Sequence, residues 1–169
     1  MEGKFYGAEK FKPRLIITQM MVMQTSFGFC FASFAAVFDM VVSEPVSISQ
    51  LFSGQSYTWD TTAGLALAFS LWVTALVMAV LLPHVVERAK KCLDFVATYH
   101  FFHFVATCFF AGFPGSLQWW VIHGVALAVA VLLGEYICMQ SETQSITLGS
   151  KHNKAKQKPK VSKPNFEEI

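Results

Sequence analysis

The sequence predicts an all-α polytopic membrane protein: four transmembrane helices in an antiparallel bundle, followed by a disordered basic C-terminal tail. Two observations predict this class. First, 54% of the 169 residues are hydrophobic and only 14% are charged, against roughly 25% charged residues in soluble domains. Second, the thirteen basic residues form three islands separated by long apolar gaps. A soluble domain of this length could not bury so much apolar surface, whereas a bilayer accepts it.

Four apolar stretches are long enough to cross the hydrocarbon core, which takes about 20 residues of helix. The third stretch is the weakest candidate because it carries Asp94, His100 and His103. Pro83 stands in the last turn of the second. The predicted spans run from Leu15 to Phe38, Gly64 to Val86, Leu93 to Phe110 and Leu117 to Met139.

The segments between the spans predict the orientation. Residues 42–63 contain no lysine or arginine, and residues 111–116 are uncharged and rich in glycine and proline. All basic residues lie in the islands Lys4–Arg14, Arg88–Lys91 and Lys151–Lys163. The positive-inside rule places these islands in the cytosol. We therefore expect a cytosolic N-terminus (1–14), a four-span domain (15–140) and a cytosolic tail (141–169).

The tail is rich in lysine, contains Pro159 and Pro164, and has few apolar residues. Such a segment buries too little surface to offset its chain entropy, so disorder is expected. Two interpretations of its charge stay open. It either lies on anionic lipid, at roughly 1 kcal/mol per lysine near the surface, or is a solvated tail that enforces topology. The net charge is only +2, so no nucleic-acid partner is expected.

Ionisable side chains at membrane depth are candidates for function. Asp94 and Glu135 lie on neighbouring spans at similar depth, close to the island Arg88–Lys91. One interpretation is an ion-paired network that holds the cytosolic ends of the helices together. The others are a polar recognition surface for a cytosolic partner and a proton relay.

Two histidines, His100 and His103, share one helix face because they are three residues apart. They are weak metal candidates, since a metal site needs three or four convergent ligands and the chain has no His-Glu-x-x-His pattern. Interhelical hydrogen bonding explains them better. Cys92 and Cys138 lie at predicted cytosolic membrane edges, where palmitoylation competes with simple packing as their role. No cofactor is expected.

The sequence has neither a nucleophile–base motif nor a phosphate-binding glycine loop, so an enzyme is not predicted. A small proton- or metal-coupled transporter is the alternative function. It would use His100, His103, Asp94 and Glu135.

One block of residues carries a family resemblance. It reads Glu-Arg-Ala-Lys-Lys-Cys-Leu-Asp-Phe through Phe95, His100-Phe-Phe-His103, Trp119-Trp120, and Gly134-Glu-Tyr-Ile-Cys138. This block resembles the Sys family of Golgi integral membrane proteins. Toward the N-terminus the match is looser, because Phe11-Lys-Pro13 stands where the family usually has Trp-Asp-Pro.

The resemblance implies four spans, residence in the Golgi and often the trans-Golgi, and a role in vesicle-mediated protein trafficking. It also implies a membrane receptor that recruits an N-terminally acetylated Arf-like GTPase. Such a receptor must present its contact face to the cytosol. From their depth we expect that face to comprise six residues: Arg88, Lys90, Lys91, Asp94, Glu135 and Tyr136.

Overall fold

The protein is a bundle of four long helices in a computed structural model that describes residues 13–86 and 91–156. Its elements in chain order are α1 (Pro13–Val42), the short 3-10 helix η1 (Ile48–Phe52), α2 (Thr62–Val85), α3 (Cys92–Ala111) and α4 (Leu117–Lys156). Each of the four α-helices is long and apolar enough to cross a membrane. The predicted all-α, four-span class is confirmed.

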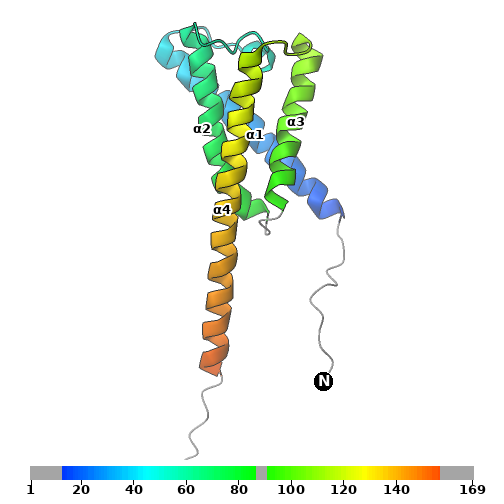
Figure 1. Cartoon of the computed structure of the whole chain (residues 1–169), viewed down its shortest axis with the longest axis vertical. Coiled ribbons are helices and arrows are strands. Elements are labelled where there is room, and N and C mark those ends of the chain that lie inside the picture. Colours follow the sequence, from blue (N-terminus) through cyan, green and yellow to red (C-terminus); the bar gives the residue numbers. More distant parts are fainter. Residues whose placement is uncertain (1–12, 87–90, 157–169) are drawn as a thin grey trace, which may run out of the picture.

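The helices run up and down, so that both described connections, 43–61 and 112–116, lie at one end of the bundle (Figure 1). We call this the loop end. The opposite end, where α1 and α3 begin and α2 ends, is called the basic end. Helix α2 packs most extensively against α1 and α4, while α3 packs against α4, α1 and η1. The helices therefore follow one another around the bundle in the order α1, α2, α4, α3.

The core of α1 is a single stripe at four-residue spacing: Met23, Phe27, Phe31, Ala35 and Asp39. Residues at this spacing share one face of a helix. The opposite face exposes large apolar side chains such as Phe29 and Met40, which are 74% and 71% exposed. Hydrocarbon surrounds such side chains at no cost, because lipid tails are as apolar as the side chains themselves.

Helix α2 is the most buried of the four, and small residues account for much of its buried face. Gly134 of α4 lies close enough to α2 that a Cβ there would contact Leu82 at 3.5 Å. Trp72 of α2 donates a hydrogen bond from Nε1 to the carbonyl of Ile122 on α4 at 3.3 Å. Small residues let two helix backbones approach closely in a membrane, which explains the extensive α2–α4 contact.

The loop end is held together by the turn that precedes α4. Ser116 is the N-cap residue: its Oγ accepts a hydrogen bond from the N–H of Trp119 at 3.3 Å and donates one to the carbonyl of Gly54 at 2.8 Å. Trp120 donates from Nε1 to the carbonyl of Pro114 at 3.0 Å. Ser116 thus connects the first loop to the start of the last helix.

Replacing Ser116 with alanine is expected to destabilise the protein by about 1–2 kcal/mol, because the cap and the bond to Gly54 are both lost. The midpoint of thermal unfolding in detergent, followed by tryptophan fluorescence, measures this. Gly115→Ala is the matched control, since a Cβ there meets nothing within 4 Å. Equal midpoints for the two variants would contradict the assigned role of Ser116.

The last helix differs from the sequence prediction. A disordered tail is expected from residue 141, whereas α4 continues as helix to Lys156. Extending an existing helix is far easier than nucleating one, and glutamine, glutamate and lysine are good helix formers. Figure 1 shows this extension projecting beyond the basic end of the bundle. The remainder of the tail, 157–169, and the N-terminus, 1–12, lie outside the described residues.

Candidate functional site

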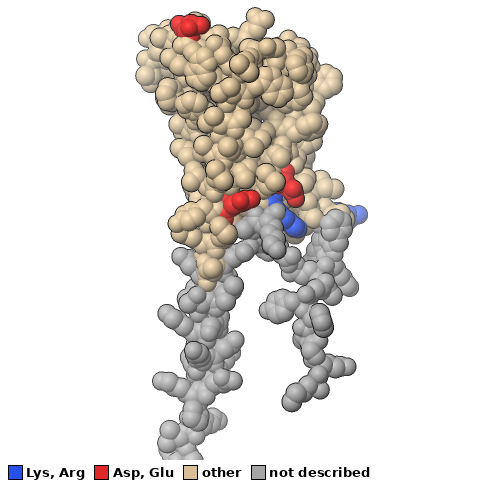
Figure 2. Space-filling model, viewed as in Figure 1, with Lys and Arg blue, Asp and Glu red and all other residues tan. Residues whose placement is uncertain are grey.

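The charged side chains divide the molecule into an uncharged band and two ends. On the face in Figure 2, lysine and arginine side chains of the described residues appear only toward the basic end, and an acidic group marks the loop end. The broad surface between them carries no charge. This is the distribution that a bilayer imposes, because a charged side chain at its centre is costly.

The structure brings part of the predicted contact face together at the basic end. Lys91 and Asp94, around the start of α3, are exposed, and on α4 Glu135 is partly buried. Tyr136 is 55% exposed, and its hydroxyl accepts a hydrogen bond from Nε2 of Gln140 at 2.7 Å. We call these four residues, Lys91, Asp94, Glu135 and Tyr136, the charged face.

The two other predicted contact residues, Arg88 and Lys90, lie outside the described residues. Among the residues that the structure does describe, Lys91, Asp94 and Glu135 form no ion pair with one another. Their polar groups therefore stand open to solvent or to a partner. Asp94 also lies in the first turn of α3, where the helix dipole favours a negative charge.

The start of α3 is joined to α4 by two cysteines. Sγ of Cys92 lies 3.1 Å from Sγ of Cys138, and the two side chains are 0% and 2% exposed. Both thiols point into the α3–α4 contact instead of toward the bilayer. Palmitoylation, which the sequence left open beside simple packing, needs a thiol at the surface.

Three histidines gather in the core near the loop end. His103 of α3 stacks on His123 of α4 with ring centroids 5.2 Å apart, and His123 stacks on Trp119 at 4.0 Å. His100 lies against Tyr99 at 4.7 Å. Rings from three other segments contact them: Phe27 and Phe31 from α1, Phe52 from η1 and Tyr57 from the first loop. We call His100, His103 and His123 the histidine cluster.

The hydrogen bonds of the cluster are incomplete. Nδ1 of His100 and of His123 each pair with the carbonyl four residues earlier, both at 3.1 Å. Nε2 of all three histidines is buried with no partner among the described residues. Neighbouring rings stacked at 15° do not aim their nitrogens at one point, and no group of metal-binding side chains is found in the described part of the chain. The cluster therefore acts here as aromatic packing.

One buried acidic residue was missed by sequence reasoning. Asp39 lies beyond the predicted end of the first span at Phe38, yet α1 continues to Val42 and Asp39 is 1% exposed. Gln50 of η1 donates a hydrogen bond from Nε2 to one carboxylate oxygen of Asp39. Asp39 is four residues after Ala35 and continues the spacing of the buried residues of α1. This spacing was the signal in the sequence that could have predicted its burial. This contact ties the first loop to the end of α1.

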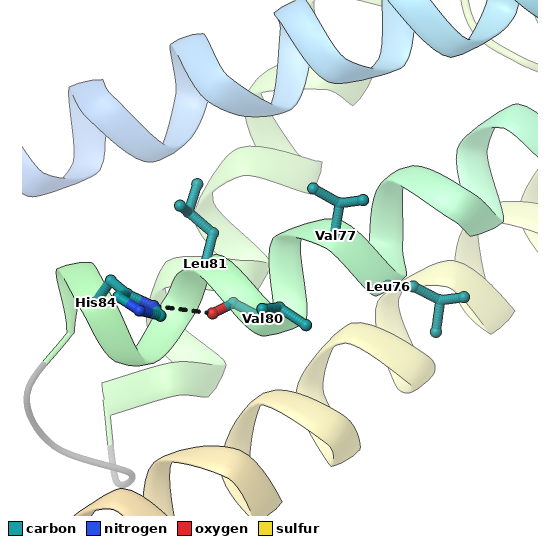
Figure 3. Close-up of a pocket in the computed structure, with 5 residues that line it drawn as sticks. All are labelled: Leu76, Val77, Val80, Leu81 and His84. Atoms are coloured by element: carbon teal, nitrogen blue, oxygen red, sulfur yellow. Dashed lines mark hydrogen bonds between the residues drawn. The ribbon is translucent and has the colours of Figure 1, made fainter.

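Described residues line two hollows at the surface. The larger, about 520 Å³, is open and lined by α2 alone: Leu76, Val77, Val80, Leu81 and His84. Figure 3 shows its only polar side chain, His84, turned back onto its own helix, where Nδ1 pairs with the carbonyl of Val80 at 3.1 Å. The smaller, about 380 Å³, lies at the loop end and is lined by four serines, Gln50, Phe52, Phe110 and Ala111. Small-molecule sites combine an apolar wall with convergent polar groups. The α2 hollow lacks such polar groups.

Tyr57 belongs to the loop end outside the spans. Its hydroxyl donates to the carbonyl of Leu51 at 3.4 Å, and complete burial raises its pKa above the usual range. The phenol therefore stays protonated and is a structural hydrogen-bond donor.

The fold and these sites define a multi-pass membrane protein with an uncharged bundle and a charged face at one end. The family model described as "Integral membrane protein S linking to the trans Golgi network" matches residues 6–148. The chain belongs to this SYS1 family, which is not known as a family of enzymes.

Two relatives show how the likeness is distributed. A Protein SYS1 homolog of Dictyostelium discoideum is 32% identical over 144 residues, covering 85% of this chain and 62% of the relative. The chain thus spans less than two thirds of that relative. A Protein SYS1 homolog of Nematostella vectensis is 32% identical over 138 residues, covering 82% of this chain and 88% of the relative. No solved structure matches the chain.

Proposed function

We propose that this SYS1-family protein is a Golgi membrane receptor that recruits an N-terminally acetylated Arf-like GTPase, with its basic end and both termini in the cytosol. The charged face carries the proposal. Lys91, Asp94 and Tyr136 are exposed and Glu135 is partly buried, so the face combines both signs of charge with an aromatic side chain from the start of α3 and from α4. Exposed tyrosine and unpaired charges are typical of surfaces that bind protein partners.

The depth of the charged face suits this kind of partner. Lys91 directly precedes α3, and Asp94 lies in the first turn of that helix, so both stand at the edge of the uncharged band. A GTPase with an amphipathic N-terminal helix binds in the plane of the membrane interface. Its globular part would then meet the charged face while its helix lies in the adjacent lipid.

Removing the protein from cells tests the function as a whole. The Golgi localisation of the Arf-like GTPase is expected to be lost and to return when the full chain is expressed again. Proximity labelling from Golgi membranes should also enrich the GTPase. A GTPase that stays on the Golgi without this protein would contradict the proposal.

Charge reversal tests the residues. The double variant Lys90→Glu with Lys91→Glu is expected to lower GTPase binding about tenfold, equivalent to about 1.4 kcal/mol, through like-charge repulsion and lost steering. Binding is measured by co-purification from detergent extracts at physiological salt.

The matched control is Lys151→Glu with Lys154→Glu, which makes the same change of charge beyond the matched residues 6–148. Wild-type binding by the 90/91 variant in a folded protein would contradict this assignment of the contact face. Equal losses in both variants would indicate a bulk effect of charge instead of a local contact.

The alternative function, a proton- or metal-coupled transporter, makes a separate prediction. Replacing both His100 and His103 should abolish a flux across proteoliposomes while the fold survives. The described residues do not form a path for a proton or metal ion across the bundle. The histidine rings contact aromatic side chains, and Asp94 and Glu135 lie at the other end of the bundle. Intact protein without any flux would remove this alternative.

A further inference from the structure

Cys92 and Cys138 bring two buried thiols together where α3 meets α4. The two thiols are 46 residues apart in the sequence and 3.1 Å apart in space. Sγ of Cys138 also lies 4.0 Å from the carbonyl oxygen of Val86. The end of α2, the start of α3 and the middle of α4 therefore meet around these sulfur atoms.

We propose that Cys92 and Cys138 are a modification site: a dithiol that converts reversibly to an intramolecular disulfide linking α3 to α4. A disulfide has its sulfurs about 2.05 Å apart, so the two atoms have only about 1 Å to travel. Cys30 and Cys108 are partly buried, and neither contacts another sulfur in the described part of the chain. The chain thus contains one paired site and two internal controls.

Hydrogen peroxide is the oxidant in the proposed reaction. One thiol attacks a peroxide oxygen, the O–O bond breaks, and one water leaves while a sulfenic acid forms on sulfur. The second thiol then displaces the hydroxyl group as a second water, and the S–S bond forms. The two sulfurs lose two electrons, which reduce the peroxide. A dithiol reductant reverses the bond by exchange.

Burial favours this intramolecular step over other reactions of the thiols. A bulky electrophile does not reach side chains that are 0% and 2% exposed, whereas hydrogen peroxide is small. Once one sulfur is oxidised, the other is already positioned, and such fixed neighbours react with a very high effective concentration. In the topology proposed above the buried pair lies near the cytosolic end of the bundle, and in the reducing cytosol disulfides are transient and serve as redox sensors.

The bond would act next to the charged face, and this consequence rests on the proposed function. Cys92 follows Lys91 directly, and Cys138 is two residues after Tyr136. Drawing the sulfurs together moves the start of α3, whose first turn carries Asp94, toward α4. We expect the disulfide form to bind the GTPase at least twofold less than the dithiol form.

Thiol counting on the full chain in native membranes tests the site. Membranes are treated with hydrogen peroxide, quenched, denatured, and labelled with a maleimide-polyethylene glycol that adds a fixed mass per thiol. The wild-type protein should change from four labels to two and return to four after dithiothreitol. Cys30→Ser with Cys108→Ser should change from two labels to none. Cys92→Ser should keep three labels throughout.

Two results would overturn the site. One is four labels on the wild-type chain after peroxide. The other is a disulfide whose linked peptides, identified by mass spectrometry, do not contain Cys92 and Cys138. The Cys30/Cys108 variant keeps the pair intact, so the test stands even where Cys92→Ser does not fold.

GTPase binding to oxidised and reduced membranes is measured in parallel. Equal binding by the two forms overturns the regulatory effect. No binding by either form contradicts the proposed function and leaves the thiol count to decide the disulfide.

Discussion

Gly64→Ala is expected to destabilise the bundle by about 3 kcal/mol, at the upper end of what one added methyl group causes in a packed site. A Cβ at Gly64 would stand 2.3 Å from the carbonyl oxygen of Thr58 and 2.7 Å from its backbone nitrogen. Backbone atoms cannot rotate away as the end of a side chain does. Either the first loop must leave its position or α2 must begin later.

The same residue is part of the helix cap, which adds to the effect. Its N–H donates to Oγ1 of Thr61 at 3.1 Å, and displacing the loop breaks this bond. Unfolding in detergent with rising denaturant or temperature, followed by tryptophan fluorescence, measures the loss. Gly124→Ala is the matched control, because nothing lies within 4 Å of a Cβ there. Equal stability of the two variants would contradict the close packing of the first loop against the start of α2.

His103→Ala is expected to cost about 3 kcal/mol, as for other large-to-small core changes. The ring of His103 is 5.7 Å from those of Phe27 and Phe31 and 5.6 Å from that of Phe52. Removing it leaves a cavity at the point where α1, η1, α3 and α4 meet. The first loop should therefore loosen as well, and hydrogen exchange at residues 48–57 should increase.

His103→Leu separates packing from polar chemistry. Leucine has a similar volume and lacks the Nε2 atom that has no partner among the described residues. Replacing an unpaired buried polar group by an apolar one of similar shape is close to neutral, so we expect a change below about 1.5 kcal/mol. A loss as large as that of His103→Ala would contradict the packing role. It would mean that Nε2 has a partner, as a transporter requires.

The sequence predicted the four spans because a bilayer requires long apolar helices. Such stretches can be recognised in the sequence without any tertiary information. The sequence predicted the end of the first span near Phe38, and α1 continues to Val42. A carboxylate in the next position normally marks the edge of the apolar region, yet Asp39 is buried and paired with Gln50 of η1. Only the return of the first loop over the bundle provides that partner.

The candidate site was predictable in part. Depth along each span placed Asp94 and Glu135 at the same level, and the structure has both at the basic end. The contact between Cys92 and Cys138 was not predictable, because it depends on the rotation of α3 and α4 about their own axes. The histidine cluster was similar: His100 and His103 share a face in the sequence, but the stack on His123 requires the register between two helices.

Composition and the spacing of charge along the sequence by themselves determined that this chain is a membrane protein with four spans. Those properties follow from the cost of burying charge and unpaired backbone in hydrocarbon, which acts on each segment separately. The tertiary structure alone decided which side chains meet: α2 against α4, the enclosed histidine cluster, and the thiol pair beside the charged face. These depend on how helices rotate and slide against one another, and in lipid close packing sets that arrangement.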